Sequence, residues 1–398
     1  MIKQLLIFTV FIGASISSVA TERPPQFVNL AFDGSKSLRM WQRTTEFAKA
    51  EDVKFTYFIS GVYFLSDANK RFYDGPRRSP GRSDIGFGGR ADSVAARNSW
   101  VHAAHRAGHE VASHANGHFD GSSWSGNEWI SELEQFKSIL LWSQENYGGA
   151  NTRPWQQGVL QNIIGFRAPL LGRNNAMFTA LRQQGYAYDT SRVRAANHWP
   201  EKLNGVWDFP LASLRMAYSN KRTLSMDYNM YVAQSGGKKG NEANFSRWEN
   251  EVYETYLKYF KANYLGNRAP LDIGHHFSLW NGGIYWRAMK RFTQTVCEIP
   301  EVVCGTYTDL VNFLDSKSNL DIQNYRAGNF QKGSVSNLPT TVARVSNVDW
   351  SDEVLTPEVI AELESQVCPA EAHLDDGVLE DEIDDGIFLR VPNLNSPF

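Results

Sequence analysis

The chain contains little cysteine and little net charge, and after its first twenty residues it has no apolar run long enough to span a membrane. Three cysteines in 398 residues leave no room for a cysteine-rich chitin-binding module. A net charge of -3 gives no reason to expect a nucleic acid as partner. A hydrophobic content of 42% allows a large core, which favours one big α/β unit with an appendage over several small modules.

The first twenty residues have the pattern of a secretory signal peptide. A basic Lys3 precedes an apolar run over residues 5–16, and small residues end at Ala20. This pattern predicts cleavage after Ala20 and export, so that the mature protein is secreted or periplasmic. A retained N-terminal anchor is the alternative.

Short apolar or β-branched runs alternate with amphipathic stretches along residues 24–314. The predicted strands lie at residues 27–32, 53–59, 109–114, 163–169, 206–210 and 270–277, and two predicted helices cover 129–147 and 244–264. Strands that alternate with helices indicate a parallel sheet, here most simply a distorted (β/α) barrel. We expect this domain to cover residues 21–318 and a C-terminal extension with an acidic tail to cover 319–398.

Two histidines in the segment SHANGH lie four residues apart, at His114 and His118. Residues at this spacing are neighbours on one side of a helix or tight turn, so both imidazoles can reach one metal ion. Chance histidine pairs are common, however, and the pair is weak support for a metal site when taken alone.

Four further motifs accompany this pair in a fixed order. They are FDG at 32–34, GFRAP at 165–169, VWDFP at 206–210 and LDIGHHF at 271–277. Together with the histidine pair they resemble the five motifs of the polysaccharide deacetylases, the NodB-homology domain of carbohydrate esterase family 4. The layout is most similar to the chitin deacetylase-like branch, and the resemblance covers residues 24–314. It implies a barrel of the polysaccharide deacetylase type.

The resemblance also implies roles for individual residues. His114 and His118 would hold a divalent metal, most simply Zn, which lowers the pKa of a bound water and polarises a carbonyl. Asp33 would be the general base, and Arg167 would orient its carboxylate and keep it ionised.

His276 would be the general acid of the same reaction. We expect Asp208 to hold it in its working tautomer, with Asp189 as a rival for that task. The neighbouring His275 is expected to be structural, because the family pattern places the catalytic imidazole last.

The chain departs from the family at Gly34, where the first motif carries a second aspartate that binds the metal. The site would then hold metal with two histidines and waters, or Asp33 would itself coordinate the metal and share the duty of base, or activity would be lost. Asp120 would substitute only if its loop bends back. We predict the metal ligands to be His114, His118 and Asp33, with hydrolase activity retained.

The expected substrate is a polysaccharide with N-acetylglucosamine units, with peptidoglycan favoured over chitin. Trp124, Trp280 and Tyr63 are predicted to line the sugar groove, with Tyr285 as a further candidate, although core packing is the ordinary role of each such ring. A sugar-binding protein without catalysis, and an esterase acting on O-acetyl groups, are the alternatives.

Three segments stay open from the sequence alone. Cys297 and Cys304 either form a local disulfide, leaving Cys368 odd, or remain free thiols. Residues 70–97 are expected to form a long, arginine-bearing loop at the mouth of the cleft. The acidic tail after residue 371 lacks EF-hand spacing and is expected to be a solvated segment.

Overall fold

The computed structural model of the protein describes residues 22–148, 158–348 and 355–366. The predicted signal peptide, Cys368 and the acidic tail lie outside these residues. The strands are β1 Gln26–Gly34, β2 Thr56–Ile59, β3 Glu110–Ser113, β4 Gly165–Phe166, β5 Tyr188–Asp189, β6 Val193–Ala195, β7 Glu201–Leu203, β8 Val206–Asp208, β9 Leu211–Arg215, β10 Arg222–Leu224, β11 Leu271–His276 and β12 Val302–Val303.

The main sheet has the strand order β11-β1-β2-β3-β4-β5-β8-β7, and β12 pairs with the start of β1. Its pairs are parallel except that of β7 with β8. The register of β1 with β11 places Asp33 beside His276. Because parallel strands end at the same edge, the residues at their carboxyl ends gather there.

A smaller sheet, ordered β10-β9-β6, connects the two ends of the main sheet. Strand β8 leads directly into β9, and Ser225 after β10 accepts a hydrogen bond from the backbone N–H of Gly274 in β11 at 2.9 Å. The strands therefore curl into a distorted barrel, as the alternation of strands and helices predicts. Each strand predicted from the sequence overlaps an observed one.

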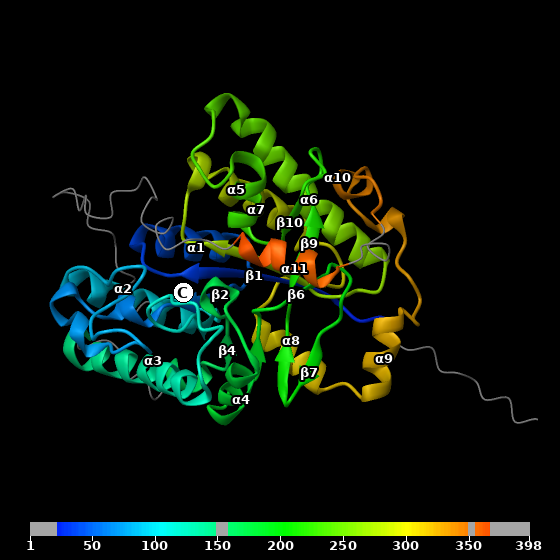
Figure 1. The fold of residues 1–398 in the computed structure, drawn as a ribbon. Helices are drawn as coiled ribbons and strands as arrows, with labels where there is room; N and C mark the ends of the chain where they lie inside the picture. Colours follow the sequence, from blue (N-terminus) through cyan, green and yellow to red (C-terminus); the bar gives the residue numbers. More distant parts are fainter. Residues whose placement is uncertain (1–21, 149–157, 349–354, 367–398) are drawn as a thin grey trace, which may run out of the picture.

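The helices surround these strands (Figure 1). They are α1 Leu38–Ala50, α2 Ala91–Arg106, α3 Gly126–Tyr147, α4 Asn175–Gln183, α5 Asp227–Ser235, α6 Phe245–Leu265, α7 Trp280–Val296, α8 Tyr307–Asp315, α9 Asn319–Ala327, α10 Thr340–Ala343 and α11 Pro357–Ser365. The two helices predicted from apolar periodicity are α3 and α6. Helix α3 begins at a capping box in which Ser125 and Glu128 satisfy each other's backbone groups.

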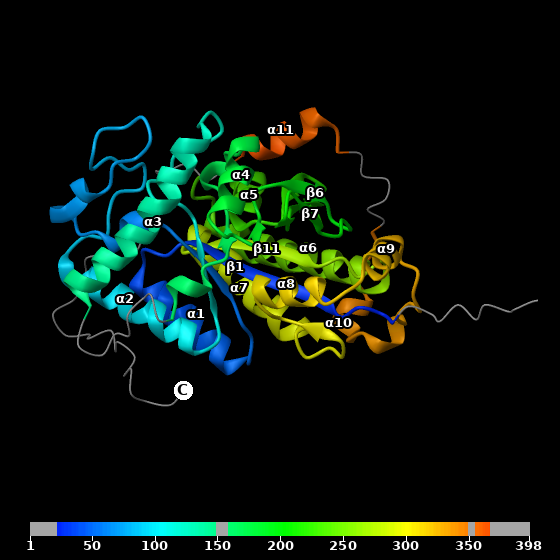
Figure 2. The ribbon, with the colours of Figure 1, turned by 90° about the horizontal axis from the view of Figure 1, so that it is seen from below.

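The part of the C-terminal extension that the structure describes packs on the barrel. Ile322 and Tyr325 of α9 join the apolar cluster inside the barrel, and Leu363 of α11 packs in a cluster with Leu171 and Met226. Figure 2 shows α11 at the edge of the molecule, and Asn229 of α5 donates a hydrogen bond to the carbonyl oxygen of Gln366, directly after α11. The domain boundary at residue 318 stays a prediction.

Cys297 and Cys304 form a disulfide between the end of α7 and the residue after β12. This resolves the choice between a bridge and free thiols in favour of the bridge. No helix among the described residues is long and apolar enough to cross a membrane.

The arginine-bearing loop is shorter than predicted. Irregular backbone ends where α2 begins at Ala91, and Arg97 lies inside that helix, 3% exposed. Its guanidinium donates to the carbonyl oxygens of Lys36 and Tyr63 at 2.8 and 2.6 Å. Arg97 therefore fastens the loops at the mouth of the barrel and is not offered to a ligand.

Candidate active site

A buried ion pair between Asp33 and Arg167 lies at the carboxyl end of the sheet. The guanidinium Nη1 of Arg167 donates to Oδ1 of Asp33 at 2.9 Å, and the two side chains are 0% and 3% exposed. Asp33 is carried by β1, and Arg167 follows β4 directly. The pair predicted from the motifs is therefore brought together by strands 134 positions apart.

Arg167 has further partners around its guanidinium. Its Nε donates to Thr190 Oγ1 at 2.6 Å and its Nη2 to Asp272 Oδ1 at 3.4 Å, while its charge lies 4.4 Å from the ring centre of Phe58. Burial lowers the pKa of Arg167, but the charges around it, Asp33 first among them, outweigh burial and raise that pKa. The guanidinium is permanently charged and holds the Asp33 carboxylate in position.

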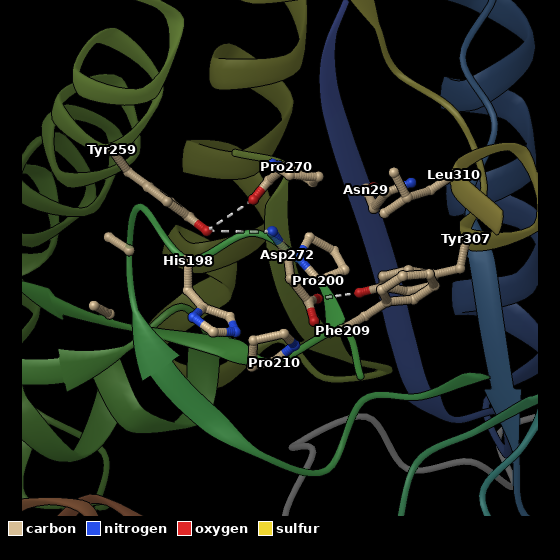
Figure 3. Close-up of a pocket in the computed structure, with 12 residues that line it drawn as sticks. Asn29, His198, Pro200, Phe209, Pro210, Tyr259, Pro270, Asp272, Tyr307 and Leu310 are labelled. Atoms are coloured by element: carbon tan, nitrogen blue, oxygen red, sulfur yellow. Dashed lines mark hydrogen bonds between the residues drawn. The ribbon is translucent and has the colours of Figure 1, made fainter. Parts of the chain in front are cut away.

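A small cavity lies towards the amino ends of β1 and β11, with Asn29, His198, Asp272 and Tyr307 in its lining (Figure 3). Its volume is about 10 Å³, the space of a water molecule. Tyr307 donates its hydroxyl hydrogen to Asp272 at this level of the barrel. The cavity is too small for a sugar ring.

His114 and His118 lie side by side, with ring centres 5.3 Å apart. His114 Nδ1 is 2.8 Å from the carbonyl oxygen of Arg167 and must be its protonated nitrogen, because a carbonyl only accepts. Burial lowers the pKa of His114, so the imidazole is neutral and its Nε2 carries a lone pair. This is the protonation state in which histidine binds a metal.

The loop that carries His118 is shaped by Glu132 of α3. The Glu132 carboxylate accepts from the backbone N–H of Asn116 at 2.9 Å and from the hydroxyl of Tyr73 at 2.9 and 3.0 Å. A Cβ on Gly117 would lie only 2.6 Å from the Phe119 ring and 2.7 Å from the Tyr73 ring, so only glycine fits there. Glu132 thus fixes the loop in which His118 adopts a φ of 59°.

His276 is held by Asp227, the first residue of α5. Asp227 Oδ1 is 2.7 Å from His276 Nδ1, and Oδ2 accepts from the His276 backbone N–H at 2.9 Å. Burial raises the pKa of Asp227, but the charge of His276 and hydrogen bonds from His275 and His276 outweigh it and hold that pKa well below its usual range. The ionised carboxylate fixes the tautomer of His276 with the proton on Nδ1.

His275 fills a structural place, as predicted. Its Nδ1 is 3.5 Å from Asp227 Oδ2 and its Nε2 is 3.1 Å from the hydroxyl of Tyr256. Both ring nitrogens therefore have protein partners, which leaves His276 as the imidazole suited to proton transfer.

The prediction that Asp208 or Asp189 holds His276 is wrong. Neither carboxylate oxygen of Asp208 has a hydrogen-bond partner among the described residues, and its nearest ion-pair atoms belong to Arg192 and Arg194, both at 3.8 Å. Asp189 accepts instead from the backbone N–H and the hydroxyl of Ser191. Burial, and then the charge of Asp189, raise the pKa of Asp208 to about 7.

The predicted three-ligand metal set of His114, His118 and Asp33 is also wrong. Within residues 22–148, 158–348 and 355–366, no three His, Cys, Asp or Glu side chains come together in a way that suits a metal ion. Asp33 is engaged by Arg167, and Asp120 accepts a hydrogen bond from the backbone N–H of Ser122 at 2.8 Å. The two histidines supply two of the three predicted ligands, and the part of the chain that the structure describes places no third ligand with them.

Gly34 stands where the family places that ligand, and its backbone is built for glycine. Its φ is 101°, in the region that side-chain-bearing residues rarely adopt, and Ser35 follows with a φ of 80°. An aspartate at position 34 would therefore strain the backbone by roughly 1–3 kcal/mol in addition to adding a carboxylate.

The three aromatic residues predicted for the sugar groove are buried. Tyr63, Trp124 and Trp280 are 1%, 6% and 6% exposed, so none presents an open ring face. Trp124 packs on Trp129 with ring centres 4.7 Å apart, and contact of these three residues with a substrate stays a prediction. Trp280 lies beside the site, 5.2 Å from the His276 ring, and Tyr285 is 2% exposed.

Two site residues were missed in the sequence. Asp272 shares a strand face with His276, because side chains alternate along β11, and this period of two was available from the segment LDIGHH. Asp227 had a weaker signal, a single acid in the apolar stretch LSMDYNMY. Asp227 reaches His276 through the bridge that sets the preceding residue, Met226, beside Gly274.

Comparison with known proteins gives matches among solved structures alone. No protein-family model and no curated protein matches the chain. A candidate polysaccharide deacetylase from Mycobacterium smegmatis is 13% identical over 79% of this chain and 98% of its own, with a TM-score of 0.47. The allantoinase Puue is 13% identical, covering 79% and 99%, with a TM-score of 0.46.

A pseudoenzyme of carbohydrate esterase family 4 from Bacillus anthracis matches as well. It is 11% identical over 73% of this chain and 66% of its own, with a TM-score of 0.38. These are likenesses at low identity, and the roles assigned here rest on the chain's own geometry.

We predict that Asp227→Asn lowers turnover by roughly 10²- to 10⁴-fold, because the amide no longer fixes the tautomer or stabilises the charged imidazole. Asp208→Asn is the matched control and should lower it far less. Steady-state rates at saturating substrate, with thermal unfolding to verify folding, measure both. Equal losses of turnover in the two variants would contradict a specific orienting role for Asp227.

We predict that stability falls as pH rises from about 4.5 to about 7, in part through Glu132. Burial raises the pKa of Glu132 from 4.5 to about 7, so in this window the folded chain keeps a proton that the unfolded chain releases. Denaturant unfolding gives the free energy of unfolding at each pH in this range. For Glu132→Gln, the slope of that free energy against pH should be smaller by the equivalent of about one proton. Glu134→Gln, an exposed change on the same helix, should keep the full slope; equal slopes in all three proteins would be the contrary result.

Proposed function

We propose that this protein is a hydrolase that removes acetyl groups from N-acetylglucosamine residues of a cell-wall polysaccharide. The observation that carries the proposal is the register of β1 with β11, which sets Asp33 directly beside His276. One is a carboxylate held by Arg167 and the other an imidazole held by Asp227. Amide hydrolysis is helped by a base and an acid that lie close together, and these two residues lie at the same edge of the sheet.

In this proposal the Asp33 carboxylate takes a proton from the attacking water. Arg167 holds that carboxylate in position through the hydrogen bond from its Nη1 to Oδ1 of Asp33. With Nδ1 of His276 held by Asp227, Nε2 is the nitrogen that gives a proton to the departing amine. Asp227 stabilises the positive charge of the imidazolium before that transfer.

The same proposal includes a divalent metal, most simply Zn, on His114 and His118. When bound, such an ion supplies a Lewis acid for the acetyl carbonyl. The protein offers it two imidazoles and no third side chain among the described residues, so water or substrate would complete the coordination. No step assigned here to Asp33, Arg167 or His276 depends on it.

Peptidoglycan is the polymer we favour, with chitin as the close alternative. The signal-peptide pattern of the first twenty residues supports export to the compartment where such polymers lie. The resemblance of the five motifs to polysaccharide deacetylases supports the acetyl group as the one removed.

A sugar-binding protein without catalysis is the second candidate function. The glycine-adapted backbone at Gly34 and the missing third ligand favour it. It predicts glycan binding without acetate release.

The test is acetate release from purified peptidoglycan and from N-acetylglucosamine oligomers, with bound metal quantified before and after chelation. We expect the native protein to release acetate and His276→Ala to lose at least about 99% of the rate. His118→Ala should lower the metal content, whereas His105→Ala, a histidine of α2 outside the site, should change neither reading.

Each outcome decides a separate point. Acetate that disappears with the metal would mean that two histidines suffice to hold a required ion. Acetate that persists after chelation would leave the base and acid in place and remove the metal from the proposal. Binding without acetate, on every substrate, would contradict the hydrolase and establish the sugar-binding protein.

A further inference from the structure

A cleft of about 550 Å³ lies on the flank of the barrel between α1 and α7. Its lining comes from two short segments, residues 43–47 of α1 and 279–290 at the start of α7: Arg43, Glu46, Phe47, Leu279, Gly282, Gly283, Trp286, Arg287 and Lys290. The volume is in the range of small-molecule and saccharide sites. None of the base, acid or histidine-pair residues lines it.

The lining carries three cations and one carboxylate. Arg43, Arg287 and Lys290 oppose only Glu46 within the cleft, although the chain as a whole has a net charge of -3. A concentration of positive charge on an acidic protein creates a local potential that attracts anions.

The cations differ in how firmly they are held. Arg287 is fixed by Glu249, at 2.7 Å, and by the carbonyl oxygen of Gly282, at 2.6 Å. Arg43 is exposed and forms no ion pair with any described residue. It is thus available to pair with an anionic ligand in the fork geometry that suits carboxylates and phosphates.

An aromatic wall completes the cleft. The rings of Phe47 and Trp286 meet edge to face with centres 5.6 Å apart, and the Lys290 ammonium lies 5.7 and 5.8 Å from them. Aromatic faces next to cations suit a ligand that is both ring-shaped and acidic.

The cleft also adjoins the candidate active site. Leu279 lines it, and the next residue, Trp280, packs against the His276 ring at 5.2 Å. The cleft and the candidate site are thus built partly from adjacent residues of one segment.

We propose that this cleft binds an acidic saccharide segment of the polymer, next to the sugar that is deacetylated. The inference rests on the proposed function for the polymer and names its chemistry: an anionic glycan in preference to a neutral one. Arg43 and Lys290 would pair with its acidic groups, while the half-buried Phe47 contacts its rings.

The experiment measures binding of two probes by calorimetry, a galacturonic acid hexamer and an uncharged N-acetylglucosamine hexamer. We expect the acidic probe to bind the native protein at least about tenfold more tightly. Arg43→Gln with Lys290→Gln should weaken the acidic probe by about tenfold and leave the neutral one unchanged. Arg182→Gln, an exposed arginine of α4 outside the cleft, is the matched control.

Equal affinity for the two probes, or an acidic preference that survives the double change, would overturn the proposal, as would an equal loss in Arg182→Gln. Acetate release is measured separately on the neutral hexamer. If the double change abolishes binding of the acidic probe but the native protein releases no acetate, the cleft is established and only the hydrolase is contradicted. Acetate release without acidic preference would contradict only the cleft.

Discussion

The buried ion pair of Arg167 with Asp33 is the interaction on which the site depends. Removing a guanidinium from water costs several kcal/mol unless partners surround it. Asp33 from β1, Asp272 from β11 and Thr190 after β5 supply those partners, with the ring of Phe58 from β2 at 4.4 Å. One side chain after β4 thus ties together four other parts of the barrel, and loss of either partner of the pair would leave an uncompensated buried charge.

This constraint also explains how the proposed acid and base are placed. Asp33 is positioned by Arg167, and the parallel register of β1 with β11 then fixes His276 next to it. Asp227 approaches His276 from α5, through the bridge between Met226 and Gly274. A Cβ on Gly274 would lie 2.6 Å from Met226 Cε and 3.2 Å from Arg167 Nη1, so the strand passes these side chains closely.

Much of the fold was predictable because it is encoded locally. Apolar runs and amphipathic periods predict strands and helices such as β1, β11, α3 and α6. The candidate roles of Asp33, Arg167 and His276 came from the resemblance of their motifs to a family. The partner of His276 was not predictable, because Asp208 and Asp227 are both acids near predicted strands and only packing between the two sheets selects one. The burial of Trp124 was not predictable from its polar loop, because it depends on the packing of its ring against Trp129 at the start of α3.

Gly34, where the chain departs from the motif, has a backbone conformation that favours glycine. Its φ of 101° is followed by a φ of 80° at Ser35 in the turn after β1. The direct measurement of the central claim is the acetate-release rate of Asp33→Asn, a neutral variant of nearly the same shape. We expect a loss of at least about 10²-fold in protein that thermal unfolding shows to be folded, because a base has been removed. A rate near that of the native protein would contradict the role of the Arg167–Asp33 pair in catalysis.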